Sequence, residues 1–137
     1  MIAVDTGPLV ALLDRSDNFH KLCKTTLEGF KEPLVTTWAV LTEAHHLLGF
    51  SVEVQRKLVQ LIADGDVAVH LTTEREHSRL LELADKYADL PLDLADATLV
   101  SMCEQLGIKT VFTLDMKDFT AIRPRHARAF SVIPSRG

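Results

Sequence analysis

Four acidic residues occupy positions that a surface role does not explain. Asp5 follows the apolar run at 2–4, and Asp115 follows "TVFTL". Glu43 lies within "WAVLTEAHHLL", and in "LPLDLADATLV" Asp96 shares a helical face with apolar residues. A buried carboxylate without a partner is costly, so these positions predict that something positive lies close to the acids.

No basic side chain is placed to neutralise these acids. Lys and Arg are absent from 1–14, 38–50 and 87–108, and the histidines are scattered without the spacing typical of zinc ligands. A bound cation would balance the charge, and all-oxygen ligands favour Mg²⁺ or Mn²⁺. No Ser–His or Cys–His pair is arranged for nucleophilic catalysis, so the sequence indicates metal-assisted chemistry.

The elements that must position the acids alternate between strands and helices. Short apolar runs predict strands at 2–5, 34–36, 67–71, 110–114 and 130–133. Helical patterns cover 8–14, 17–31, 38–48, 51–64 and 74–87, and a last helix runs from the N-cap Asp93 to about Gly107. This alternation predicts one α/β domain over 1–137, a three-layer α/β/α sandwich with a mostly parallel sheet.

In such a sheet the four acids can meet at one edge. Asp5 and Asp115 end strands, Asp96 begins a helix, and Glu43 faces inward from an apolar stripe; ligand sites gather at the carboxyl edge of parallel sheets. Each acid also has a simpler interpretation, such as Asp96 pairing with Asp93 in a capping box. The coincidence of all four at one edge favours a single site.

Charge and composition limit the other options. The chain of 137 residues has a net charge of −4, yet residues 109–137 hold six Lys or Arg against two Asp. This asymmetry indicates an anionic partner for the C-terminal segment. No apolar run approaches the roughly 18 residues of a membrane span, and "MIAVDTG" does not resemble a signal peptide, so we expect a cytoplasmic protein. Cys23 and Cys103 are expected to be buried, reduced residues.

These segments together resemble the PIN-domain family, and within it the VapC-type toxin nucleases. The resemblance runs through the whole chain and is carried by four segments in order, with their acids 38, 53 and 19 residues apart: "MIAVDTGPLVALLD", "TTWAVLTEAHHLL", "LDLADATLVSMCEQLG" and "TVFTLDMKDF".

The resemblance implies a metal-dependent ribonuclease. It assigns Asp5, Glu43 and Asp96 as catalytic metal ligands for one or two Mg²⁺ or Mn²⁺ ions. The fourth ligand is Asp115, with Asp118 as the alternative. The hydroxyl groups that would orient these ligands belong, in this family, to the positions of Thr6 and Thr113.

The resemblance and the charge pattern also predict partners. We expect single-stranded or structured RNA as the substrate, with phosphate contacts from Lys117, Arg123 and Arg125. A small antitoxin protein is a further expected partner. The leucines of the first two helices suggest a homodimer; they are Leu9, Leu12, Leu13, Leu22 and Leu27. The alternative is a non-catalytic PIN domain that binds RNA or protein.

Overall fold

The computed structural model describes residues 1–135; Arg136, counted above among the basic residues, lies outside the described residues. Strands and helices alternate along the chain as the sequence predicts. In chain order they are β1 Ile2–Val4, α1 Thr6–Leu13, α2 His20–Glu28, β2 Leu34–Thr37, α3 Trp38–Leu47, α4 Val52–Ala63, β3 Val67–His70, the 3₁₀ turn η1 Glu74–Glu76, α5 His77–Lys86, α6 Leu94–Leu106, β4 Thr110–Phe112, α7 Met116–Ala121 and β5 Ser131–Ile133.

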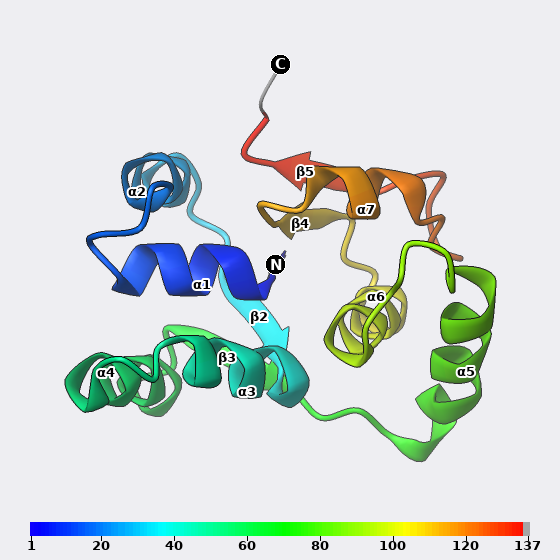
Figure 1. Ribbon diagram of the computed structural model, residues 1–137. Helices are drawn as coiled ribbons and strands as arrows, with labels where there is room; N and C mark the ends of the chain where they lie inside the picture. The colour runs from blue at the N-terminus through cyan, green and yellow to red at the C-terminus, as the bar shows by residue number, and fades with distance from the viewer. Residues whose placement is uncertain (136–137) are drawn as a thin grey trace.

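The strands form one sheet in the order β3-β2-β1-β4-β5, and every neighbouring pair is parallel. The chain moves outward from β1 to β3 and then crosses back to β4. Because such crossovers are right-handed, α1 to α4 and α5 to α6 cover opposite faces (Figure 1). The predicted three-layer α/β/α fold is confirmed, with a sheet that is wholly parallel.

Local capping signals fix where the main helices begin and end. The Thr37 and Ser51 side chains accept hydrogen bonds from backbone N–H groups in the first turns of α3 and α4. Asp93 caps α6 in the same way, and α6 stops at Gly107, whose φ of 70° is a left-handed conformation that suits glycine. The predicted cap at Asp93 and the predicted stop at Gly107 are therefore confirmed.

Three local predictions are wrong in detail. The second helix covers His20–Glu28 rather than 17–31, because the Asp17 carboxylate accepts the Phe19 N–H and holds a turn. A 3₁₀ turn precedes α5. The helix α7 is missing from the prediction, since its six residues are too short to show a period.

Most of the leucines predicted for a dimer surface on the first two helices are at least partly covered within the monomer. Leu9 is 1% exposed, and Leu12, Leu13 and Leu27 are partly buried and pack against the core, whereas Leu22 is partly exposed outside that core. The homodimer stays a prediction. Cys23 and Cys103 are buried, as predicted, and neither forms a disulfide within the described residues. Among residues 1–135, no helix has the length and apolarity to cross a membrane.

Candidate active site

The four predicted acids line one pocket of about 340 Å³ at the carboxyl edge of the sheet. Asp5 follows β1 and Asp115 follows β4, and these strands are neighbours although most of the chain separates them. The chain changes direction across the sheet between β1 and β4. This is the switch point at which parallel α/β sheets bind ligands.

A threonine connects the two acids that follow these strands. The Asp5 N–H donates to the Phe112 carbonyl at 2.9 Å, which continues the ladder between β1 and β4. The Thr113 hydroxyl donates to Asp5 Oδ2 at 2.7 Å and accepts the Asp115 N–H at 2.9 Å. Thr113 is fully buried, so this pair of bonds fixes the Asp5 carboxylate relative to the chain at Asp115.

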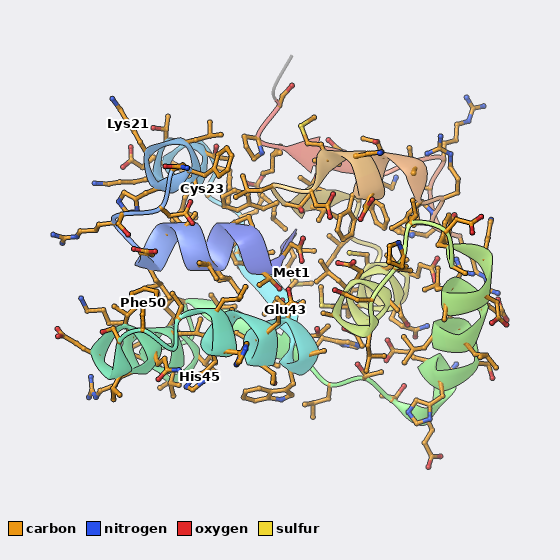
Figure 2. All side chains as sticks on the ribbon, viewed as in Figure 1. Met1, Lys21, Cys23, Glu43, His45 and Phe50 are labelled. Carbon is orange, nitrogen blue, oxygen red and sulfur yellow. The ribbon has the colours of Figure 1, made fainter. Side chains whose placement is uncertain are left out.

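Glu43 and Asp96 enter the pocket from two helices that a buried hydrogen bond holds together. The Thr98 hydroxyl donates to the Ala95 carbonyl at 2.8 Å, so the Thr37 hydroxyl, 2.9 Å away, donates to Thr98. This bond joins the start of α3 to the first turns of α6. In Figure 2, Glu43 lies on the side of α3 that faces α1.

The pocket is electrostatically strained by its own acids. Burial is the main cause that raises the pKa of Asp5 to about 6, and the charges of Glu43 and Asp115 add to it against the hydrogen bond from Thr113. Burial likewise raises the pKa of Asp96 to about 8, with added repulsion from Asp5 and Asp93. Both shifts favour the neutral acids and are what a missing counter-charge produces.

Two further acids line the pocket. Asp93 was predicted only as a helix cap, and it does accept the Asp96 N–H at 2.8 Å. Asp17 reaches the pocket from the turn before α2. Sequence reasoning missed Asp17 because its position depends on how that turn folds back, and no local signal reports this.

Asp118 and Thr6 differ from the expectations placed on them. Asp118 is not among the pocket-lining residues; its N–H donates to Asp115 Oδ1 at 3.4 Å, which caps α7. Asp115 lines the pocket itself, and Asp118 contacts Asp115 from the first turn of α7. The Thr6 hydroxyl is buried and has no hydrogen-bond partner within residues 1–135, so it does not orient a carboxylate as Thr113 does.

The donor set fits a hard divalent cation. Among residues 1–135, every titratable side chain lining the pocket is a carboxylate, and no Lys or Arg lines it. Such oxygen donors suit Mg²⁺ or Mn²⁺. No three His, Cys, Asp or Glu side chains of the described residues are already grouped to hold an ion. Mg²⁺ commonly keeps several of its waters, so a pocket of this size can hold a hydrated ion with few direct ligands.

The three predicted phosphate contacts lie in different environments. Lys117 is exposed in the first turn of α7, directly after Asp115. The Arg123 N–H donates to the Tyr87 hydroxyl at 2.8 Å, beside the end of α5 that precedes α6. Arg125 pairs with Glu82, and its N–H donates to Glu104 at 2.7 Å.

Arg125 is therefore held beside Glu104, away from the Asp96 end of α6. Glu104 is eight residues after Asp96 in α6, which places it about 12 Å along the helix at 1.5 Å per residue. The guanidinium of Arg125 is also already partnered by a carboxylate.

Comparison with known proteins gives consistent matches. A family model described as "PIN domain" matches residues 2–123. "Ribonuclease VapC26" of Mycobacterium tuberculosis (strain ATCC 25618 / H37Rv) is 28% identical over 133 residues, covering 96% of this chain and 98% of that protein. The crystal structure of Mycobacterium tuberculosis VapC20, described as a "Sarcin-Ricin loop cleaving toxin", superposes with a TM-score of 0.81 at 22% identity, covering 93% of this chain and 99% of that one.

Proposed function

The chain belongs to the PIN domain family, and on this premise we propose that it is a metal-dependent endoribonuclease, the toxin of a type II toxin–antitoxin pair. The observation that carries the proposal is the pocket at the switch point, where carboxylates from four separate segments gather without a basic side chain. We propose that Asp5, Glu43, Asp96 and Asp115 hold Mg²⁺ or Mn²⁺ there.

The protein supplies the position and charge of the ligands. A divalent ion in this pocket provides a nucleophilic water at neutral pH and stabilises charge on the scissile phosphate. Thr113 keeps the Asp5 carboxylate oriented through its 2.7 Å hydrogen bond. The hydrogen bond between Thr37 and Thr98 holds α3, which carries Glu43, against α6, which carries Asp96. The carboxylates from these two helices therefore stay directed at the same pocket.

RNA as the substrate is supported by the relative named a ribonuclease, which matches nearly the whole chain. The toxin role is supported by the structural neighbour described as a toxin that cleaves the sarcin–ricin loop. We propose Lys117 and Arg123 as the main phosphate contacts, since Arg125 is already paired with Glu82. A small antitoxin, a homodimer, a cytoplasmic location and a single nuclease domain over 1–137 remain predictions.

A non-catalytic PIN domain that binds RNA or protein is the alternative. Loss of one pocket acid would favour it, but all four are present and line the pocket. A basic side chain in the pocket would also favour it, because an internal ion pair removes the need for a metal. The lining residues include none, so the catalytic proposal is the stronger one.

Cleavage of single-stranded RNA tests the proposal. The purified chain should cut a fluorescent RNA in Mg²⁺ or Mn²⁺ and stop when EDTA is added. Asp96→Asn should lose most activity while keeping its fold. Asp85→Asn, a change at an exposed acid of α5, should keep both its activity and its fold. A wild type that binds RNA without cutting it would support the alternative, and cleavage that survives Asp96→Asn would reveal a contaminating nuclease.

A further inference from the structure

A second groove, of about 520 Å³, continues from the acidic pocket between α3 and the start of α6. The two cavities share Glu43 and Asp93. An extended strand with one phosphate at the acidic pocket can therefore place its next nucleotide in this groove. The remaining lining residues are Ala39, Thr42, His46, Leu94 and Ala95.

The chemistry of the groove suits a nucleobase better than a phosphate. Its walls include three apolar side chains, and Leu94 is 66% exposed. Its charged members are Glu43 and Asp93, which repel a phosphate, and no Lys or Arg of the described part of the chain lines it. A neutral, planar ring can cover the apolar wall and stack on an imidazole, as bases do on aromatic side chains in proteins that bind single-stranded RNA.

His46 is the only ring in this groove, within the described residues. It follows Glu43 by three positions, so both side chains lie on the same face of α3. The Thr42 hydroxyl already gives its proton to the Trp38 carbonyl at 2.8 Å, and the other polar lining groups are the carboxylates of Glu43 and Asp93. The exposed His46 imidazole is therefore the group on which a base can stack.

We propose that this groove binds the base of the nucleotide next to the cleaved phosphodiester bond, and that His46 sets the base preference there. This inference rests on the proposed ribonuclease function and adds a specificity-determining residue to it. His46 contacts the base and takes no part in the bond cleavage, so its loss affects substrate binding and base choice more than the chemical step.

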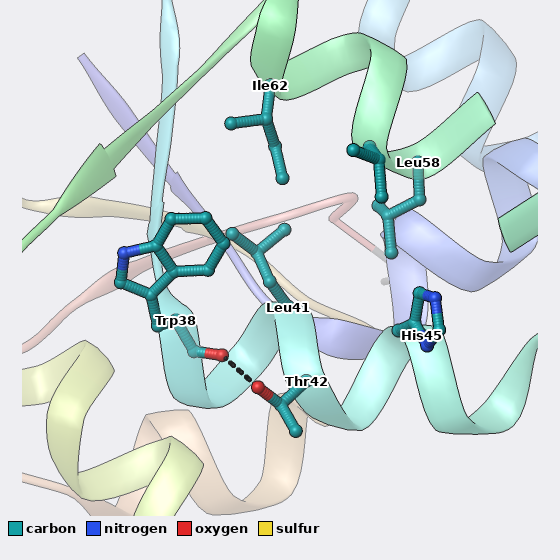
Figure 3. Close-up of a pocket in the computed structure, with 7 residues that line it drawn as sticks. Trp38, Leu41, Thr42, His45, Leu58 and Ile62 are labelled. Atoms are coloured by element: carbon teal, nitrogen blue, oxygen red, sulfur yellow. Dashed lines mark hydrogen bonds between the residues drawn. The ribbon is translucent and has the colours of Figure 1, made fainter. Parts of the chain in front are cut away.

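The neighbouring histidine provides a matched control. His45 lies on a separate pocket between α3 and α4, with Trp38, Leu41 and Leu58 (Figure 3). The Gln55 side chain donates to the His45 carbonyl at 2.9 Å. His45→Ala thus removes an imidazole from the same helix without changing the groove.

The test is a double-mutant cycle between protein and RNA. A pool of short fluorescent RNAs with randomised positions first identifies a favoured sequence for binding and cleavage. Wild type, His46→Ala and His45→Ala are then compared on that RNA and on two copies with an abasic nucleotide on either side of the cut. We expect His46→Ala to raise KM about tenfold with little change in kcat and to flatten the base preference. On one side of the cut, the abasic nucleotide should weaken binding to the wild type but cause no further loss in His46→Ala; on the other side, it should weaken binding to both proteins equally. His45→Ala should behave as the wild type.

Other outcomes separate the two proposals. If the losses from His46→Ala and from the abasic nucleotide add on both sides of the cut, or if His46→Ala keeps the base preference, the base-site proposal is wrong. The nuclease proposal would not be affected by either result. A change in oligomeric state with His46→Ala, measured by light scattering, would assign the groove to a protein contact instead. If the wild type binds RNA without cutting it, the nuclease proposal fails, and the same cycle run on binding by fluorescence anisotropy still decides the base site.

Discussion

Replacing Asp96 by Asn tests whether the acidic pocket stores a repulsion that a cation relieves. An acid whose pKa is raised in the folded state binds its proton more tightly there than in the unfolded chain. Its contribution to stability is complete below the unfolded pKa of 3.8 and is lost as the pH rises to the folded pKa, about 6 for Asp5 and about 8 for Asp96. The metal-free free energy of unfolding should therefore fall between about pH 4 and pH 8.

The size of the effect follows from these shifts. A tenfold change in proton affinity corresponds to about 1.4 kcal/mol, so the shift of Asp5 from 3.8 to about 6 costs about 3 kcal/mol at neutral pH. Asp96 is half-buried and solvent screens part of its charge, so we expect about 2 kcal/mol from it. Asp96→Asn also gives up a favourable charge in the first turn of α6, about 0.3–1 kcal/mol.

Metal-free Asp96→Asn should thus be more stable than the wild type at pH 8 by about 1–2 kcal/mol, a Tm higher by roughly 5 °C. The two proteins should converge as the pH falls toward 4 and below, where Asp96 becomes neutral in the unfolded as well as in the folded wild type. The helix start is preserved because Asp93 accepts the backbone N–H of residue 96. Thermal melts followed by circular dichroism from pH 4 to pH 9 measure both quantities.

Added Mg²⁺ should reverse the order of the two proteins. An ion that binds only the folded state stabilises it by about 2.7 kcal/mol at 100 times its Kd, and the neutral amide of Asp96→Asn should weaken that gain. Asp85→Asn should follow the wild type in both conditions. A difference between Asp96→Asn and the wild type that stays constant with pH, or an equal Mg²⁺ effect on both, would refute the reasoning.

Two further predictions concern ligand orientation and RNA contact. Thr113→Val removes the hydroxyl that links two pocket acids, and calorimetry should find Mg²⁺ affinity about 10–100-fold weaker. Thr36→Val, which removes an equally buried hydroxyl bonded within the sheet, should lower Tm without changing the Mg²⁺ affinity. An equal loss of Mg²⁺ affinity in both variants would contradict the proposal that Thr113 orients the metal ligands. Arg123→Ala should weaken RNA binding and reduce the slope of log affinity against log salt by about 0.7 to 1. Arg125→Ala should leave that slope nearly unchanged. An equal reduction of the slope in both variants would show that Arg123 and Arg125 both contact RNA phosphates.

The positions of Asp5 and Asp115 could be predicted because they depend on the backbone. Each follows a buried parallel strand, and all such strands end at the same edge, so their meeting requires only the correct sheet. The position of Asp96 could also be predicted, because an acid that begins a helix and shares a face with apolar residues is expected to point into a buried site. Glu43 needed the helical period to show that it faces inward.

Contacts that depend on side-chain packing could not be predicted in this way. The sequence predicted a helix over 74–87, and in the structure the Thr73 N–H at the start of this segment donates to the Glu76 side chain at 2.9 Å, as in a capping box. The structure adds that Glu76 is 1% exposed and accepts the Ser101 hydroxyl of α6 at 2.8 Å. A local cap therefore also anchors the helix that carries Asp96, and this depends on how the start of α5 packs against α6.

The same distinction explains why the acids of the pocket were foreseen and the adjacent groove was not. An acid beside an apolar run is improbable on its own, so its residue type carries information before any fold is known. His46 and Leu94 are unremarkable residues on the surface of their helices, and they acquire a role only because α3 and α6 begin side by side. On the two proposals, the chemistry of this site depends on residue types, whereas the base preference depends on how two helices meet.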